Sequence, residues 1–579
     1  MESESTFVAP EGVYTITEEH KPSVLAHLVS APSAYPTRVS TIAVRFPPAK
    51  SGGAPGFAQL LGGNKDSRKD KSRDDAVSLS SSDTPDEDAP AAAQENIPPS
   101  TPREHTLFAA PPAARKKKPF ARPKHNIRTT SSTFITRIQN AEGFPKTLQS
   151  KQGEVTFLFY NLAKSFLCIE VGSKAKTVRL CALQEPLARI TFSTYPTCHD
   201  VNVSTSSSER LDVIIGFSTG DLVWLDPITS RYTRLNKQGS ITNSPCTTVR
   251  WVPSSSTLFL VAHADGTIIV YDKEREDGSF TPQDPARVTT ESSSDGPQRA
   301  QKKWDPMDSI FVTMPPWHPV SSAAGTAPAA PSKVPKNPVS HWRVSRRAVL
   351  DFVFSPDVKY VAAISEDGCL RVIDALAEQL VDCYASYFGA LTSVAWSPDG
   401  RFILTGGQDD LLTIFSPWEQ RVVARCQGHS SFVSAVAFDE LRCEGRTYRF
   451  GSVGEDNKLI LWDFSSGALH RPKFHPTQQQ RVSMASTVSL AVRRDRSTLY
   501  LPAGEESPRY HPAPSRNEIA VVQPCLIKPI DGDVLTTLMF LPRSILTSSR
   551  NGYIKLWIRP LALRQRLKHR QPAPDVDVL

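Results

Sequence analysis

The sequence predicts an all-β fold, a seven-bladed β-propeller with a disordered N-terminal region and two long polar insertions. The first observation behind this prediction is a repeat in the second half of the chain. An aromatic residue before a turn recurs at equal intervals, at Phe354, Trp396 and Phe438. A second apolar landmark follows each of them, and its last copy is Trp462, directly before Asp463. The spacing is typical of WD40 blades, four-stranded sheets that bury their faces only by stacking radially.

The second observation is that strand-like alternation continues on both sides of this repeat. Alternating apolar segments predict a degenerate first blade at about 134–194, a second blade ending at Asp226 and a third ending at Asp272. The last blade contains Trp557 at the position that Trp462 has in the repeat. Counting these segments, we predict a seven-bladed WD40 β-propeller over residues 131–560.

Three parts of the chain have a composition that does not suit a propeller core. Most of the 48 prolines and many serines lie in residues 1–130, 275–340 and 466–525. Residues 1–130 include a Ser/Pro/acidic stretch with few large apolar groups, so we expect them to be disordered and order to begin near Phe134. Residues 1–110 should then be dispensable for folding. The other two stretches are expected to be polar insertions, which explains why the repeat is interrupted there.

Much of the positive charge lies outside the expected propeller. The net charge is +8, with a basic and polar tail at 561–579 and a basic stretch at 115–128. That stretch opens with four consecutive cationic residues, Arg115, Lys116, Lys117 and Lys118. Such a run suits nuclear import or contact with acidic partners, and it equally suits a solvated, disordered segment. We expect the protein in cytoplasm and nucleus.

Composition also argues against several classes of protein. No apolar run approaches the roughly 18 residues that a membrane span needs, so we expect no membrane association. The first ten residues are acidic and polar, unlike a secretory signal. The nine cysteines are scattered and form no Cys-x-x-Cys pair. This pattern favours reduced thiols in an intracellular protein over a disulfide framework or a zinc site.

One blade carries a complete set of WD-repeat polar residues. His429 precedes the blade, Ser452 lies on its second strand, Asp456 in the following turn and Trp462 on its third strand. In WD repeats such a tetrad forms a chain of hydrogen bonds between loop and strands. His429 could also be read as a general base, but the spacing to the other three favours the structural role.

No other motif predicts catalysis. The Asp-Gly pairs at Asp265, Asp367 and Asp399 fit blade turns better than metal ligands. His470 and His475 have no nearby cysteine, so a metal site is not favoured. We therefore expect no enzymatic activity, no metal and no cofactor.

Two loops that lead into successive blades carry large aromatic residues. They are SYFGA at 386–390, with Tyr387 and Phe388, and GHSSF at 428–432, with Phe432. Equivalent loops of successive blades lie on the same face of a propeller. One reading is that these rings pack between blades, as most aromatic residues are core residues. The other reading is a paired anchor for a protein partner, because aromatic residues dominate protein–protein hot spots.

Several strings of the sequence are more specific than generic blade turns. They are YFGA, ARCQGH, HDVNV, GDLVWLDPITSRYTRLNKQGSI and PVSHWRV. Through these strings, most of residues 130–560 resembles the family of CreC-type WD-repeat proteins. This family includes the fungal catabolite-repression protein CreC, the animal WD-repeat activators of ubiquitin-specific proteases and the dystrophia-myotonica WD-repeat protein. Residues 1–110 and 470–525 show no such resemblance.

The resemblance implies a non-catalytic partner that binds and stabilises or activates a ubiquitin-specific protease, CreB-like in the fungal branch. There it implies a link to carbon catabolite repression, and a second WD-repeat protein is a further candidate partner. The enzyme-contacting aromatics of the family match Phe388 and Phe432. The family more commonly has Trp at the second position, so Phe432 keeps the apolar face and loses the indole N–H donor.

Two alternatives belong to other functional classes. A substrate receptor of a cullin-type ubiquitin ligase often has an Arg two residues after the Trp-Asp pair, and Ser465 occupies that position in this chain. A nucleic-acid platform would use the basic stretch at 115–128, but no aromatic-rich basic face accompanies it. A nucleic-acid partner is therefore not favoured.

Overall fold

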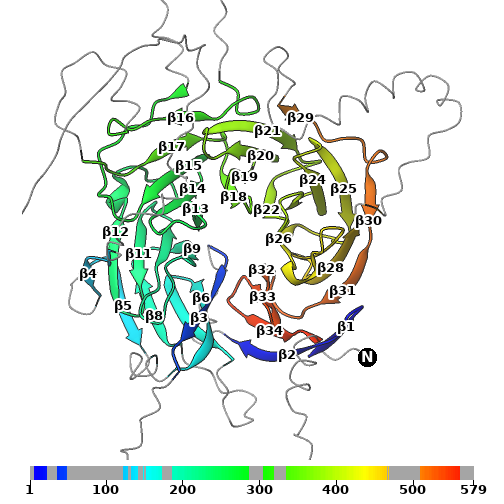
Figure 1. Ribbon diagram of the computed structural model, residues 1–579, viewed down its shortest axis with the longest axis horizontal. Helices are drawn as coiled ribbons and strands as arrows, with labels where there is room; N and C mark the ends of the chain where they lie inside the picture. The colour runs from blue at the N-terminus through cyan, green and yellow to red at the C-terminus, as the bar shows by residue number, and fades with distance from the viewer. Residues whose placement is uncertain are drawn as a thin grey trace, which may run out of the picture. The chain divides into compact units, whose positions relative to one another are not determined.

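The computed structural model describes residues 5–21, 35–48, 121–127, 132–140, 148, 151–172, 186–285, 304–318, 334–465, 467 and 509–560. They form seven β-sheets arranged as blades around a common centre (Figure 1). Nearly all of the regular secondary structure of these residues is strand, with two short 3₁₀ helices, η3 (Lys237–Gly239) and η4 (Glu440–Arg442). The predicted all-β, seven-bladed propeller is confirmed.

The first three blades each contain five strands, which follow one another from the ring centre outward. Blade 1 consists of β3 (Val39–Phe46), β6 (Gly153–Leu162), β7 (Ser165–Val171), β8 (Ala188–Phe192) and β5 (Ile135–Asn140). Blade 2 consists of β9 (Pro196–Val201), β10 (Val213–Phe217), β11 (Leu222–Asp226), β12 (Arg231–Leu235) and β4 (His125–Asn126). Blade 3 consists of β13 (Cys246–Trp251), β14 (Leu258–His263), β15 (Thr267–Asp272), β17 (Ser340–Arg343) and β16 (Phe311–Thr313).

The remaining blades follow the same plan. Blade 4 consists of β18 (Val349–Phe354), β19 (Tyr360–Ser365), β20 (Cys369–Asp374), β21 (Gln379–Ala385) and β29 (Tyr510–His511). Blade 5 consists of β22 (Leu391–Trp396), β23 (Ile403–Gly407), β24 (Leu411–Ser416), β25 (Arg421–Gln427) and β30 (Ala520–Val522). Blade 6 consists of β26 (Val433–Phe438), β27 (Thr447–Gly454), β28 (Lys458–Ser465) and β31 (Pro524–Pro529). Blade 7 consists of β32 (Leu535–Phe540), β33 (Ser544–Ser549), β34 (Ile554–Ile558), β2 (Gly12–His20) and β1 (Thr6–Ala9).

The N-terminal segment closes the ring. Strand β2 pairs antiparallel with β34, so blade 7 combines strands from both terminal parts of the chain, and β3 is the innermost strand of blade 1 (Figure 1). The prediction that residues 1–130 are disordered and that order begins near Phe134 is therefore wrong for residues 5–21, 35–48 and 121–127. The physical reason is that an open edge of β34 offers backbone donors and acceptors, and an alternating segment can satisfy them wherever it lies in the chain.

The tip of this N-terminal hairpin is anchored by buried contacts. The rings of Phe7 and Tyr14 are stacked with centroids 4.7 Å apart, and Phe7 also packs on Trp557 at 5.2 Å. The carboxylate of Glu11 accepts a hydrogen bond from Arg449 of blade 6 at 2.7 Å. We therefore expect that residues 1–110 cannot be removed as a block without loss of stability. The basic stretch Arg115–Lys118 and the tail at 561–579 lie outside the described residues.

The two predicted insertions also contribute strands. Within 275–340, β16 adds the outermost strand of blade 3 and β17 begins at Ser340. Within 466–525, residues 509–522 cross the outer edges of two blades, and we call this segment the strap. Its strands β29 and β30 pair in parallel with β21 and β25 (Figure 1). The prediction of polar insertions alone is wrong for these parts, because extended segments satisfy the unpaired outer edges of the blades.

A buried charge cluster joins blade 2 to blade 3. Asp212 is fully buried, and its carboxylate accepts hydrogen bonds from Arg210 at 3.0 Å, from Lys273 at 2.8 Å and from the indole N–H of Trp224 at 2.8 Å. The hydroxyl of Thr205 donates a further bond at 2.7 Å. Burial alone would raise the pKa of Asp212, but the cations, above all Lys273, hold it below its ordinary value. The carboxylate is thus the common acceptor for two buried cations.

Two buried histidines make the fold sensitive to acid. His199 lies in blade 2 and His341 in blade 3, and burial lowers the pKa of both imidazoles to about 4. The unfolded chain would bind protons at these positions from about pH 6.5 downward, where the folded chain does not. The free energy of unfolding therefore decreases as the pH falls through this window. Asp200 acts in the opposite direction, because burial raises its pKa to about 6.

We expect the melting temperature to depend less on pH when one of these histidines is removed. Between pH 7 and pH 5, the melting temperature of a His341→Gln variant should fall by less than that of the unaltered chain. The difference in the free energy of unfolding should be on the order of 1 kcal/mol, which corresponds to about 2–4 °C. Circular dichroism melts of both proteins across this range measure the difference, and Asp200 contributes equally to both. Parallel curves would show that His341 is not neutral in the folded state.

Candidate partner-docking face

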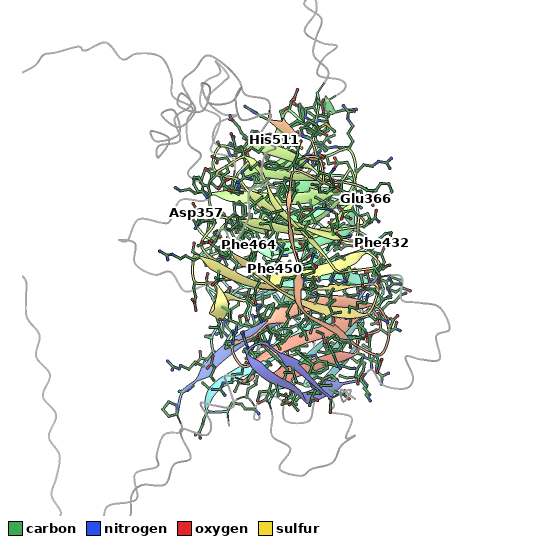
Figure 2. All side chains as sticks on the ribbon, turned by 90° about the vertical axis from the view of Figure 1, so that its right-hand side faces the viewer. Asp357, Glu366, Phe432, Phe450, Phe464 and His511 are labelled. Atoms are coloured by element: carbon green, nitrogen blue, oxygen red, sulfur yellow. The ribbon has the colours of Figure 1, made fainter. Side chains whose placement is uncertain are left out.

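The propeller presents two faces, and the aromatic loops lie on one of them. Figure 2 views the blades edge-on and shows Phe432 and Glu366 on one face and Asp357 on the opposite face. Glu366 lies in the turn between β19 and β20, whereas Asp357 lies in the turn between β18 and β19. We call the face that carries Phe432 the docking face.

Phe388 lies on this docking face in the connection between β21 and β22. The backbone N–H of Ser386 donates a hydrogen bond to the carbonyl of Gly368 at 2.7 Å, in the turn that carries Glu366. The Phe388 side chain is 71% exposed. The structure therefore does not pack this ring between blades, which was one of the two readings of the sequence.

The shape of this loop depends on Gly389. Its φ of +63° lies in the left-handed region, and a Cβ there would approach the Gln408 side chain to 2.9 Å. The Gln408 amide oxygen accepts a hydrogen bond from the N–H of Ala390 at 3.0 Å, and Ser386 Oγ donates to the Gly389 carbonyl at 3.0 Å. These bonds hold the base of the loop while Phe388 projects from its tip.

Phe432 lies in the equivalent connection between β25 and β26 and is 40% exposed. Its carbonyl accepts a hydrogen bond from the N–H of Glu455 at 2.9 Å. The two aromatic loops belong to adjacent blades, which are joined directly because the Thr392 hydroxyl donates to the carbonyl of Val433. Phe388 and Phe432 therefore offer two partly or largely exposed rings on one face of neighbouring blades.

The four tetrad residues of blade 6 form a continuous hydrogen-bonded chain beside Phe432. The indole N–H of Trp462 donates to Ser452 Oγ at 2.9 Å, and His429 Nε2 lies 2.8 Å from the same oxygen. His429 Nδ1 lies 3.0 Å from the Asp456 carboxylate, which also accepts the N–H of Ser430 at 2.9 Å. All polar groups of the set have partners and Ser452 is fully buried, so the four side chains link the entry loop to the strands of blade 6.

Electrostatics reinforces this arrangement. Burial alone would raise the pKa of Asp456, but the bonds from His429 and from the Ser430 N–H lower it well below its ordinary value. The carboxylate is thus charged throughout the physiological range and fixes the loop that precedes Phe432.

Blade 5 lacks this chain at the equivalent positions. Tyr387 takes the place that His429 has in blade 6, and Phe415 takes the place of Trp462. The hydroxyl and the carboxylate of the set are kept, as Thr405 and Asp409. Among the described residues, Tyr387 Oη, Thr405 Oγ1 and one oxygen of Asp409 are buried without a hydrogen-bond partner. Burial raises the pKa of Asp409, in contrast to its counterpart in blade 6. The docking face therefore combines one loop with a complete tetrad and one loop without it.

Tyr387 itself is half-buried and is covered from outside the blade. The guanidinium of Arg516, in the strap, lies 5.5 Å from the centroid of its ring. Sequence reasoning missed Arg516, because it lies between β28 and β31 in a stretch with polar composition and no periodic pattern.

A metal site would need several ligating side chains close together among the described residues. Among them, no cluster of three or more His, Cys, Asp or Glu side chains could hold a metal ion. A search of the same residues found no helix with the length and apolar character of a membrane span. What the face does present is exposed aromatic surface on a rigid frame.

Comparison with known proteins identifies the repeat and a relative. The family model described as WD domain, G-beta repeat, matches residues 381–416, which span β21 to β24. The UBP9-binding protein bun62 of Schizosaccharomyces pombe is 35% identical over 456 residues, which cover 78% of this chain and 77% of that protein. Among solved structures, a chain of the mitotic checkpoint complex aligns with a TM-score of 0.43 and 10% identity, over 78% of this chain and 99% of the other. That structural likeness is too low to support an argument about function.

The sequence relationship, in contrast, extends over most of the chain. With more than a third of aligned positions identical along most of both chains, and with seven blades and a WD-repeat tetrad in the structure, the protein belongs to the family of WD-repeat proteins that includes the UBP9-binding protein bun62.

Proposed function

We propose that this protein is a non-catalytic scaffold that binds a ubiquitin-specific protease through its docking face. The observation that carries the proposal is the exposure of Phe388 and Phe432 on one face of adjacent blades. Exposed aromatic rings on a rigid frame are the usual centre of a protein–protein interface. The name of the relative bun62 supports a ubiquitin-specific protease as the occupant.

The scaffold would act on the protease by binding its active conformation more tightly than the inactive one. In this proposal the protease supplies the catalytic residues and the propeller supplies none. We further propose that a second WD-repeat protein joins the complex, that the protein works in cytoplasm and nucleus, and that in a fungal host it serves carbon catabolite repression.

Affinity purification of the tagged full-length chain, followed by mass spectrometry, tests the identity of the partner. A ubiquitin-specific protease should be among the proteins recovered in stoichiometric amount. The recovered protease is then assayed on a fluorogenic ubiquitin substrate with and without the chain. Turnover by the chain alone, or the absence of any such protease from the purification, would overturn the proposal.

Replacement of either docking ring should weaken protease binding without unfolding the propeller. Phe388→Ala and Phe432→Ala are each expected to cost about 2 kcal/mol of binding free energy, or roughly 30-fold in Kd. The melting temperature should change little for Phe388→Ala, because a ring that is 71% exposed loses little burial on truncation. Calorimetric titration and thermal melts of the same variants measure both quantities.

Trp418 provides the matched control. It is 61% exposed, and its indole N–H donates to the carbonyl of Gly400 at 3.2 Å. Gly400 lies in the turn between β22 and β23, which corresponds to the Asp357 turn of blade 4 on the face opposite Phe432 (Figure 2). Trp418→Ala should bind the protease with unchanged affinity. An equal loss from Trp418→Ala would show that the docking face is not the specific site.

A further inference from the structure

The two docking loops are held in different ways. The loop before Phe432 is tied to its blade by the tetrad through His429, whereas the loop with Phe388 has Tyr387 at that position. The hydroxyl of Tyr387 has no hydrogen-bond partner among the described residues. A buried donor without a partner does not hold a loop in place. The loop is held at its base by the bonds of Ser386 and Ala390, and the ring of Tyr387 offers a further point of contact beside Phe388.

That support comes from the strap. Arg516 lies between the two strap strands β29 and β30, and its guanidinium lies over the Tyr387 ring at 5.5 Å. Among the described residues it takes part in no ion pair that would draw it elsewhere. A cation over an aromatic face is attracted by the ring's negative electrostatic potential. Arg516 therefore contacts the ring of the residue that directly precedes Phe388.

Both ends of the strap are firmly attached to the blades. At the first end, the imidazole of His511 stacks on Tyr384 with centroids 4.7 Å apart and lies 2.8 Å from Asp382. Figure 2 shows His511 on the outer rim of the propeller. At the second end, β30 pairs with β25, where Val521 lies opposite Arg425. Arg516 is thus carried by a short bridge between two fixed points.

We propose that Arg516 is a positioning residue for the docking face, and that it acts through Tyr387 to hold Phe388 in its protease-binding position. This inference rests on the proposed function and adds to it. It assigns a role to the strap, since the strap links the outer edges of blades 4 and 5 to the loop that contacts the partner. The strap would therefore affect protease affinity without itself touching the protease.

The test is a double-variant cycle on the full-length chain with the protease recovered by affinity purification. Arg516→Ala should weaken binding by about two- to fivefold, the amount expected for an exposed cation–π contact. Arg516→Lys keeps the cation and should bind close to the unaltered chain. In a Phe388→Ala background, Arg516→Ala should cause no further loss, because its effect passes through Phe388.

Arg446→Ala is the matched control. Arg446 is an exposed arginine in the connection between β26 and β27, which corresponds to the Asp357 turn on the opposite face. It should leave the affinity unchanged, so that a general effect of charge is excluded. Thermal melts should show all these variants folded.

The outcomes separate this inference from the proposed function. If Arg516→Ala has no effect on binding while Phe388→Ala does, positioning by the strap is wrong and the docking face stands. If the losses from the two variants add, Arg516 contacts the protease directly and the positioning role is likewise wrong. If Phe388→Ala itself has no effect, the proposed docking face is wrong.

Discussion

Phe7→Ala should lower the free energy of unfolding by about 3–5 kcal/mol, as buried Phe→Ala changes do. Phe7 is fully buried, stacks on Tyr14 and packs against Trp557. The lost ring therefore leaves a cavity where the N-terminal and C-terminal strands meet. The measurement is a urea or guanidinium unfolding curve for both proteins, followed by tryptophan fluorescence.

The neighbouring residue gives a matched control. Val8 points outward from the same strand and is 60% exposed, so Val8→Ala should change stability by less than about 0.5 kcal/mol. Deletion of residues 1–21, which removes β1 and β2, should be more severe and yield aggregated or poorly cooperative protein. A deleted chain that melts like the intact one would mean that the N-terminal strands do not close the ring.

Asp212→Ala is expected to destabilise the propeller by about 3–5 kcal/mol, because it leaves two buried cations without their shared counter-charge. Lys273 and Arg210 both bond to this carboxylate, and the side chain of Lys273 is fully buried. The indole N–H of Trp224 would lose its acceptor as well. Denaturant unfolding of the variant measures the loss.

An exposed ion pair on the same propeller serves as the comparison. Glu419 and Arg421 are 2.6 Å apart, with about half of each side chain accessible to solvent. Glu419→Ala should therefore cost no more than about 1 kcal/mol. If Asp212→Ala were equally mild, its cluster would have to be hydrated in the folded protein, contrary to the burial of its side chains.

The repeated unit of the fold could be predicted from the amino-acid sequence alone. The tetrad of blade 6 was predicted residue by residue, because His429 and Trp462 lie within one repeat and the pattern places two strands between them. The loops with Phe388 and Phe432 were found for the same reason, since equivalent positions of successive blades lie on one face. The strands and turns of a blade are determined by residues that lie close together in the sequence. A repeating pattern in the sequence is therefore enough to predict them.

The segments that complete the blades, in contrast, became evident only in three dimensions. Strand β2 pairs with β34 from the opposite end of the propeller sequence, and the strap joins blades 4 and 5 from a stretch that reads as polar insertion. The contact of Arg516 with Tyr387 has the same origin. An unpaired sheet edge can pair with almost any extended segment, because the pairing uses backbone hydrogen bonds and depends little on side-chain identity. Which segment reaches the edge therefore depends on the path of the whole chain, and no local pattern specifies it.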